Sequence, residues 1–122
     1  PEEQVRQELW RTQVILYSLT GRQALLFRAP YVEIDDNVAR VAARMGLTTV
    51  QCDLASGDPD PAVTVDRMVR SVSQRARNGS IIVMHMNGRG WHTAEALPAI
   101  IDELNRRGFE FTTVSELIRR PR

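Results

Sequence analysis

Three short apolar runs of the sequence each lead into a polar side chain that could do acid–base chemistry: Arg28, Asp53 and His85. An arginine can orient a carboxylate, an aspartate can accept or hold a proton, and a histidine can donate one. Together they make an acid–base set of the kind that hydrolysis needs. Asp58 follows shortly after Asp53, and Trp91 and His92 stand in the glycine-containing stretch after His85. The residue types alone therefore indicate a hydrolytic site.

Each of these residues also has a purely structural explanation. Arg28 could pair with a helix carboxylate, Asp53 could cap a loop, and Asp58, which precedes Pro59, could simply form a turn. A single histidine after an apolar run is usually structural. Other chemistries lack their motifs, because the sequence contains no Gly-x-Ser-x-Gly nucleophile turn and no phosphate-binding loop.

The elements that must position these side chains alternate regularly between helix and strand. Apolar spacing, caps and glycine stops predict helices over residues 2–18, 36–45, 63–77 and 93–107, with a last helical turn over 114–119. Short apolar or β-branched runs predict strands at Ala24–Phe27, Leu47–Cys52, Ser80–Met84 and Phe109–Thr113.

This alternation predicts an α/β fold with a parallel sheet and helices on its faces. In such folds, ligands gather beyond the C-terminal ends of the strands, which is where Arg28, Asp53 and His85 are expected. Two architectures remain open, an open doubly wound sheet and part of a (β/α) barrel. Four strands are about half of an eight-stranded barrel. A half barrel leaves strand edges bare, so it should need a second half.

Composition excludes several other classes of protein. The formal net charge is +1, and the basic residues, all arginine, are scattered, so neither nucleic acid nor an acidic membrane is an expected partner. Cys52 is the only cysteine, which rules out an intrachain disulfide and a cysteine-based zinc site. No run of about 18 apolar residues is present that could span a membrane.

Read together, the motifs resemble those of the polysaccharide deacetylases, carbohydrate esterase family 4. Phe27–Tyr31 resembles the Arg-x-Pro-Tyr motif of the family, and Ile82–His85 resembles its Leu-x-His motif, with Val83 in place of the leucine. Residues 93–117 look like its closing helix and strand, and a helix ending in Leu-Thr-Gly commonly precedes the first motif. The resemblance covers nearly the whole of residues 1–122 in the right order and implies the C-terminal half of a single, distorted (β/α) barrel domain.

The resemblance implies metal-dependent hydrolysis of acetyl groups, most often N-acetyl, from a polysaccharide. Peptidoglycan, chitin-like chains and acetylated xylan all fit. The metal, usually zinc, is held in this family by an Asp-His-His set, and a further aspartate acts as base. Neither the Thr-Phe-Asp-Asp nor the His-x-x-x-His motif that carries them occurs here. The expected partner is therefore an N-terminal half with these residues, and the expected location is outside the cytoplasm.

The family also implies a role for individual residues of this sequence. Arg28 would orient the catalytic base, the backbone N–H of Tyr31 would stabilise the oxyanion, and His85 would protonate the leaving amine. The expected substrate-binding residues are Pro30, Asp58, Val83, which would line the acetyl methyl pocket, and Trp91 at the rim.

Some positions depart from the family pattern. The Asp-x-x-Asp-Trp motif aligns on residues 55–59, so that Ala55 replaces the aspartate that steadies the acid histidine and Pro59 replaces the tryptophan. Met86 replaces an aspartate that often follows the histidine. Because residues two apart in a strand face the same side, Asp53 is expected to substitute for the missing aspartate. Two other hypotheses remain, a non-catalytic carbohydrate-binding relative and an unrelated open-sheet binding domain.

Overall fold

The chain folds into two compact units, Pro1–Gln51 and Cys52–Arg122, in a computed structural model that describes residues 2–119. Residues 1 and 120–122 lie outside the described part, so a single domain over residues 1–122 stays a prediction. Each unit contains one pair of parallel strands joined through a helix, which confirms the expected α/β class with parallel strands.

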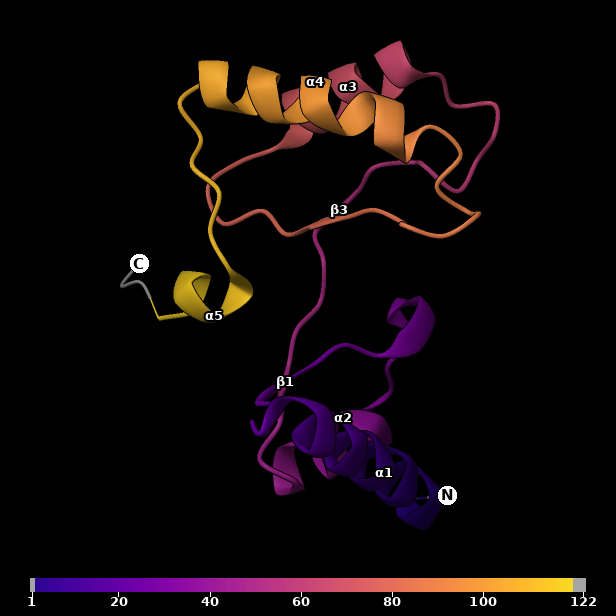
Figure 1. Ribbon diagram of the computed structural model, residues 1–122, viewed down its shortest axis with the longest axis vertical. Helices are drawn as coiled ribbons and strands as arrows, with labels where there is room; N and C mark the ends of the chain where they lie inside the picture. The colour runs from indigo at the N-terminus through magenta and orange to yellow at the C-terminus, as the bar shows by residue number, and fades with distance from the viewer. Residues whose placement is uncertain (1, 120–122) are drawn as a thin grey trace. The chain divides into compact units, whose positions relative to one another are not determined.

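In the first unit, two helices pack on each other beside the strand pair (Figure 1). Its elements are α1 (Glu2–Thr20), β1 (Leu26–Phe27), the 3-10 helix η1 (Pro30–Val32), α2 (Asp36–Arg44) and β2 (Thr48–Thr49). Leu26 pairs with Thr48, and Phe27 pairs with Thr49.

The two helices of this unit differ in how much apolar surface they bury. Helix α2 begins at an aspartate cap, because the Asp35 carboxylate accepts the backbone N–H of Val38 at 2.8 Å, and it buries Val41 and Ala42. Helix α1 has no buried residue, and apolar side chains such as Trp10 and Tyr17 are 56% and 60% exposed. The first unit therefore has only a small core.

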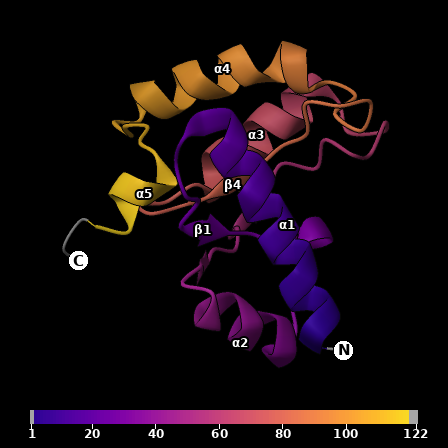
Figure 2. The ribbon, with the colours of Figure 1, turned by 60° about the horizontal axis from the view of Figure 1, so that its bottom comes forward.

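In the second unit, two helices lie over the other strand pair (Figure 2). Its elements are β3 (Leu54–Ala55), α3 (Val65–Arg75), β4 (Ile82–Val83), α4 (Thr93–Arg106) and α5 (Val114–Leu117). Leu54 pairs with Ile82, and Ala55 pairs with Val83. Because β3 and β4 are parallel neighbours, the segments that follow them leave the strand pair at the same end.

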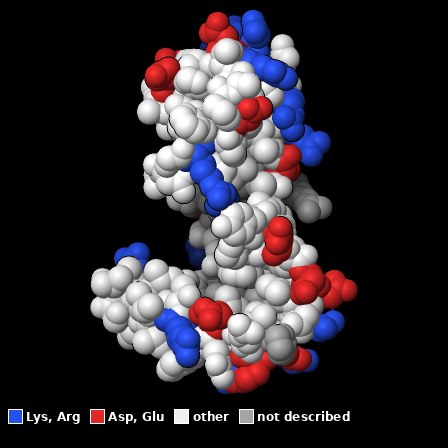
Figure 3. Space-filling model, turned by 90° about the vertical axis from the view of Figure 1, so that its right-hand side faces the viewer, with Lys and Arg blue, Asp and Glu red and all other residues white. Residues whose placement is uncertain are grey.

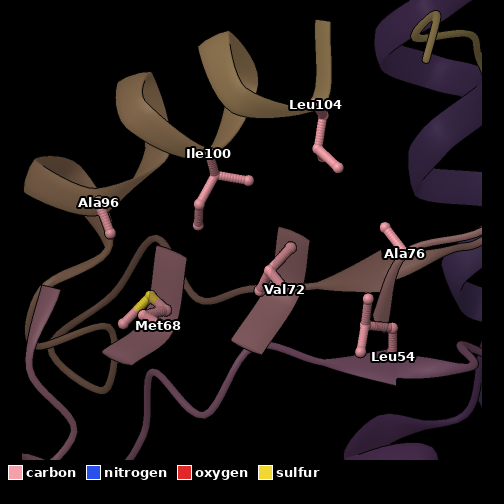
Figure 4. Close-up of a cluster of buried hydrophobic side chains, with 7 residues drawn as sticks. All are labelled: Leu54, Met68, Val72, Ala76, Ala96, Ile100 and Leu104. Atoms are coloured by element: carbon pink, nitrogen blue, oxygen red, sulfur yellow. The ribbon is translucent and has the colours of Figure 1, made fainter. Parts of the chain in front are cut away.

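The hydrophobic core lies between α3, α4 and the strands, and Figure 4 shows the α4 side chains pointing toward those of α3 and β3. It consists of seven buried residues: Leu54, Met68, Val72, Ala76, Ala96, Ile100 and Leu104. Full burial of a large apolar side chain stabilises a fold by about 1.5–3 kcal/mol before entropy is counted. This core fixes the frame from which the loops after β3 and β4 emerge.

The strands differ from the sequence-based expectation in two places. The run Leu47–Cys52 forms only β2, and the chain then enters a separate strand, β3, within a stretch that was expected to begin a loop. Phe109–Thr113 is not a strand. Residues of this segment and of the β4 region, among them Phe109, Phe111, Ile82 and Met84, line a common groove of about 600 Å³. The segment therefore has no neighbouring ladder to pair with.

The surface carries mixed charge. On the face drawn in Figure 3, acidic and basic side chains are interspersed within each unit rather than gathered by sign. Over residues 2–119, no helix is long and apolar enough to cross a lipid bilayer.

Candidate active site

His85 and Asp58 meet at the C-terminal end of the β3–β4 pair. Asp58 lies in the loop after β3, and His85 follows β4. The Asp58 carboxylate oxygen Oδ1 lies 3.0 Å from the His85 ring nitrogen Nδ1, and its other oxygen accepts the backbone N–H of His85 at 2.5 Å. One carboxylate thus holds both the ring and the backbone of the histidine.

The Asp58 carboxylate is buried and surrounded by donors. Its side chain is 1% exposed. The hydroxyls of Ser56 and Thr93 donate to it at 2.9 and 2.7 Å. Burial by itself favours the neutral acid, but the bonds from Thr93, His85 and Ser56 outweigh it and hold the pKa of Asp58 below its ordinary value. Asp58 is therefore a buried carboxylate that stays ionised.

This pairing fixes which ring nitrogen of His85 faces the protein. An ionised carboxylate can only accept a hydrogen bond, so Nδ1 of His85 carries the proton that Asp58 accepts. Nε2 is then the nitrogen left for a substrate. The His85 side chain is 32% exposed, which keeps it accessible. A histidine held in this way by a carboxylate is suited to donate or accept a proton at Nε2.

The loop between β4 and α4 is closely packed against the pair. Helix α4 begins after His92, whose side chain makes no cap bond, and the hydroxyl of the first helical residue, Thr93, goes to Asp58 instead. A Cβ at Gly90 would overlap the carbonyl oxygen of His85 and lie 2.6 Å from Thr93 Oγ1. Only glycine therefore fits at position 90 without displacement.

Asp53 lies at the opposite end of β3, so the expectation that it supports His85 is wrong. Its carboxylate accepts the backbone N–H of Ile81 at 2.7 Å and the hydroxyl of Ser80 at 3.1 Å, with Arg77 at 3.5 Å. The Ile81 bond above all lowers the pKa of Asp53. The expectation failed because Asp53 precedes a strand rather than ending one, which turns it toward the loop after α3.

The substrate-binding role expected for Asp58 is also wrong, since a side chain this buried cannot touch a polysaccharide. Its supporting role was hard to read from the sequence, because its partners lie 27 and 35 residues further along the chain. The one local signal was Ser56, whose hydroxyl bonds both the carboxylate and the backbone N–H of Asp58. A serine two residues before an aspartate commonly forms such a turn.

The remaining expected residues divide between the two units. Val83 in β4 is partly buried, and Trp91 is 60% exposed in the loop after His85. Arg28 and Pro30 are exposed in the first unit, where Arg28 makes no ion pair or hydrogen bond with any of residues 2–119. The gathering of residues from both units at one rim, and their roles, stay predictions.

The segment after β1 has a strained backbone. Tyr31 and Val32, on consecutive positions, have φ angles of 59° and 61°. This left-handed backbone conformation is unfavourable for most residues other than glycine and asparagine, and it is most unfavourable for β-branched residues such as valine. Such strain is concentrated at functional sites in proteins, which makes the Pro30–Val32 turn a candidate part of the site.

The residues that the structure describes do not form a metal site. Within residues 2–119, no three His, Cys, Asp or Glu side chains are grouped so that they could hold a metal ion. His85 is bonded through Nδ1 to Asp58, and the other histidine, His92, lies 3.8 Å from Glu95 on the surface. A metal centre of the kind that the family resemblance implies is therefore not built from this part of the chain.

Comparison with known proteins agrees with the sequence motifs. The family model described as polysaccharide deacetylase matches residues 1–50. The peptidoglycan-N-acetylglucosamine deacetylase of Bacillus cereus is 37% identical over 103 residues, which are 80% of this chain and 47% of that protein.

Two solved structures are similar over almost all of the chain. The family 4 carbohydrate esterase of Streptomyces lividans is 33% identical, with a TM-score of 0.82, over 93% of this chain and 57% of that one. The family 4 acetyl xylan esterase of Clostridium thermocellum, in complex with a cobalt ion, is 28% identical, with a TM-score of 0.85, over 97% and 56%.

The chain thus spans about half the length of these relatives. The sequence match covers 80% of this chain, and the two structural matches cover 93% and 97%. The chain therefore belongs to the polysaccharide deacetylases, the carbohydrate esterases of family 4.

Proposed function

We propose that this chain supplies the proton-donating half of a polysaccharide deacetylase site that hydrolyses N-acetyl groups. The observation that carries the proposal is the pairing of His85 with the buried, ionised Asp58, at 3.0 Å between Nδ1 and Oδ1. Such a pair stabilises the protonated ring and leaves the Nε2–H outermost. That arrangement is what a general acid requires.

In the proposed reaction, water gives a proton to the carboxylate base proposed below and adds to the acetyl carbonyl carbon, and the C–N bond then breaks. His85 gives its Nε2 proton to the departing amine nitrogen, so that the sugar leaves as a neutral amine and the acetyl group leaves as acetate. The ring stays bonded to Asp58 throughout, because Nδ1 keeps its proton. Val83 and Trp91, which flank His85 along the chain, are proposed to contact the acetyl methyl group and the sugar ring.

The first unit is proposed to complete the site. Arg28 is exposed and makes no ion pair within residues 2–119, which suits a guanidinium that orients a carboxylate base carried elsewhere. The strained turn Pro30–Val32 is proposed to aim the Tyr31 backbone N–H at the developing oxyanion. The base and the ligands of a divalent metal, zinc by family resemblance, are proposed to lie on sequence outside residues 1–122, in an N-terminal half of the same domain.

The substrate is proposed to be an N-acetylated amino-sugar polymer such as peptidoglycan. The support is the 37% identity to a deacetylase that is named for the N-acetylglucosamine of peptidoglycan. Because such a polymer lies outside the cytoplasm, the protein is proposed to act in a secreted or periplasmic compartment.

The proposal is tested with a chimera in which this chain replaces the matching region of the Bacillus cereus relative. The chimera should release acetate from N-acetylglucosamine oligomers in the presence of zinc, and chelation should abolish the release. The 122-residue chain alone should release none. The natural full-length polypeptide that contains these residues is assayed in parallel, with acetylated xylan as the competing substrate.

His85→Gln in the same chimera should lower kcat by about 10²- to 10⁴-fold, because it removes the general acid. His92→Gln is the matched control and should leave kcat unchanged, since His92 has only a surface contact with Glu95. A folded full-length polypeptide that binds the oligomers without releasing acetate would instead support a non-catalytic carbohydrate-binding relative.

A further inference from the structure

Thr93 is the first residue of helix α4, one position after the N-cap His92. A threonine at the N-cap itself commonly accepts a backbone N–H of the first turn. Helix α4 has no side-chain cap, and the Thr93 hydroxyl donates instead to Oδ2 of Asp58 at 2.7 Å. Thr93 is 8% exposed, so this bond is shielded from water.

This bond completes the set of donors that holds the Asp58 carboxylate in place. Oδ1 receives the Ser56 hydroxyl and the His85 ring, and Oδ2 receives the His85 backbone N–H and the Thr93 hydroxyl. Among the residues that the structure describes, Thr93 is the only donor from α4. It thereby ties the carboxylate to the helix that packs on the core.

The loop before Thr93 packs closely, and this packing keeps the Thr93 hydroxyl next to Asp58. Gly90 packs so closely that a Cβ there would lie 2.6 Å from the Thr93 hydroxyl and would overlap the His85 carbonyl oxygen. The backbone N–H of Trp91 also donates to the carbonyl oxygen of Asp58, at 3.3 Å. The loop is thus drawn onto Asp58 from two directions.

We propose that Thr93 is a positioning residue for His85, acting through Asp58. By holding Oδ2, the hydroxyl keeps Oδ1 turned toward His85 Nδ1, so that the ring presents the proton on Nε2 outward. Its importance for the reaction rests on the proposed function, but its effect on the ring does not. His85 is the only titratable side chain bonded to Asp58 within residues 2–119.

The test compares Thr93→Val, which keeps the shape but removes the donor, with Thr93→Ser, which keeps the donor. Ser80→Ala is the matched control, because it removes a hydroxyl that donates to an aspartate, Asp53, at the other end of the strand pair. All variants are made in the full-length protein with ¹⁵N-labelled histidine and ¹³C-labelled aspartate. The ring nitrogen shifts of His85 report which nitrogen carries the proton, and His92 serves as internal reference.

In the wild type and in Thr93→Ser, neutral His85 should carry its proton on Nδ1. In Thr93→Val, the Nδ1–H and Nε2–H forms should mix. The Asp58 carboxyl ¹³C signal should then titrate about 1–2 units higher, because a donor to a buried charge is lost. In Thr93→Val, kcat should fall about tenfold or more, with little change in KM, and Thr93→Ser should restore it. Ser80→Ala should change none of these readouts.

An unchanged His85 proton position and Asp58 titration in a folded Thr93→Val protein would overturn the inference. An equal effect of Thr93→Ser would also overturn it, because serine keeps the hydroxyl donor and the effect could not then come from the loss of that donor. If the wild type releases no acetate, the proposed function fails, and the NMR comparison still decides whether Thr93 positions His85.

Discussion

The two ends of the β3–β4 pair each carry an aspartate, and the two differ mainly in burial. Asp53 at the start of the pair and Asp58 at its end both accept a backbone N–H from the β4 side and a serine or threonine hydroxyl. The Asp53 side chain is 35% exposed, and the Asp58 side chain is 1% exposed. Only the buried one also holds a titratable ring.

The comparison shows that hydrogen-bond partners alone do not identify a functional carboxylate. Around Asp53, water can replace a lost hydrogen-bond donor. The bonds of Asp53 therefore hold the loop in place but have little influence on the ionisation of its carboxylate. The Asp58 side chain is only 1% exposed, so each donor has a larger influence on the charge and orientation of the carboxylate. The following predictions test this difference.

Asp58→Asn should have the largest effect. The amide cannot balance a protonated imidazole, so kcat of the assembled deacetylase should fall by about 10²- to 10⁴-fold. Breaking the buried set of bonds should lower the free energy of unfolding by about 1–3 kcal/mol. Acetate release and urea denaturation measure the two effects. If Asp53→Asn reduced kcat by a similar factor, the contrast between the two ends would be wrong.

Gly90→Ala should have the next largest effect, because its methyl group would collide with the His85 carbonyl and the Thr93 hydroxyl. We expect a loss of about 1–3 kcal/mol in the free energy of unfolding, measured by urea denaturation, together with lower activity. Gly88→Ala in the same loop is the matched control, since a Cβ there would meet nothing within 4 Å. Equal stability of the two variants would contradict the close packing described for this loop.

Acid should destabilise the second unit through both aspartates, and more strongly through Asp58. Each pKa is lowered on folding, so the stabilisation is fully present above the ordinary value of 3.8 and is lost as the pH falls through the lowered value. Asp58→Asn should therefore flatten the dependence of the urea midpoint on pH below about 4 more than Asp53→Asn does. The reverse order would show that burial is not the deciding factor.

Arg77→Ala should have the smallest effect. Arg77 lies 3.5 Å from Asp53 with its side chain 77% exposed. Exposed ion pairs are worth about 0–1 kcal/mol and are screened by salt. We expect the urea midpoint to shift only slightly at low salt and not at all at 1 M salt, where the Debye length is about 3 Å. A large loss of stability that persists at high salt would place Asp53 in the same class as Asp58.

The sequence predicted the helices well, because their signals are local. Caps such as Asp35, glycine stops and apolar spacing all lie within a few residues of the element that they define. The sequence correctly predicted that the strands are parallel, but it predicted their residue bounds less well. The segment at Phe109–Thr113 has the composition of a strand, but a strand forms only beside a partner, and no partner lies next to it within residues 2–119.

The site was predicted in part for the same reason. His85 was identified because it ends an apolar run and matches a family motif. Its supporting aspartate was assigned to Asp53 instead of Asp58, because alternation along an assumed strand was extended across a point where one strand ends and another begins. Thr93 could not be assigned from the sequence, since its partner lies 35 residues away and only packing brings the two together.

The concentration of bonds on one carboxylate also constrains how this protein can evolve. Positions 56, 58, 85, 90 and 93 share a single buried charge, so a substitution at one of them changes what is tolerated at the others. Substitutions at these five positions are therefore expected to occur in compensating pairs rather than independently. Lineages that keep the histidine but lose the aspartate should be rare unless a new acceptor appears nearby.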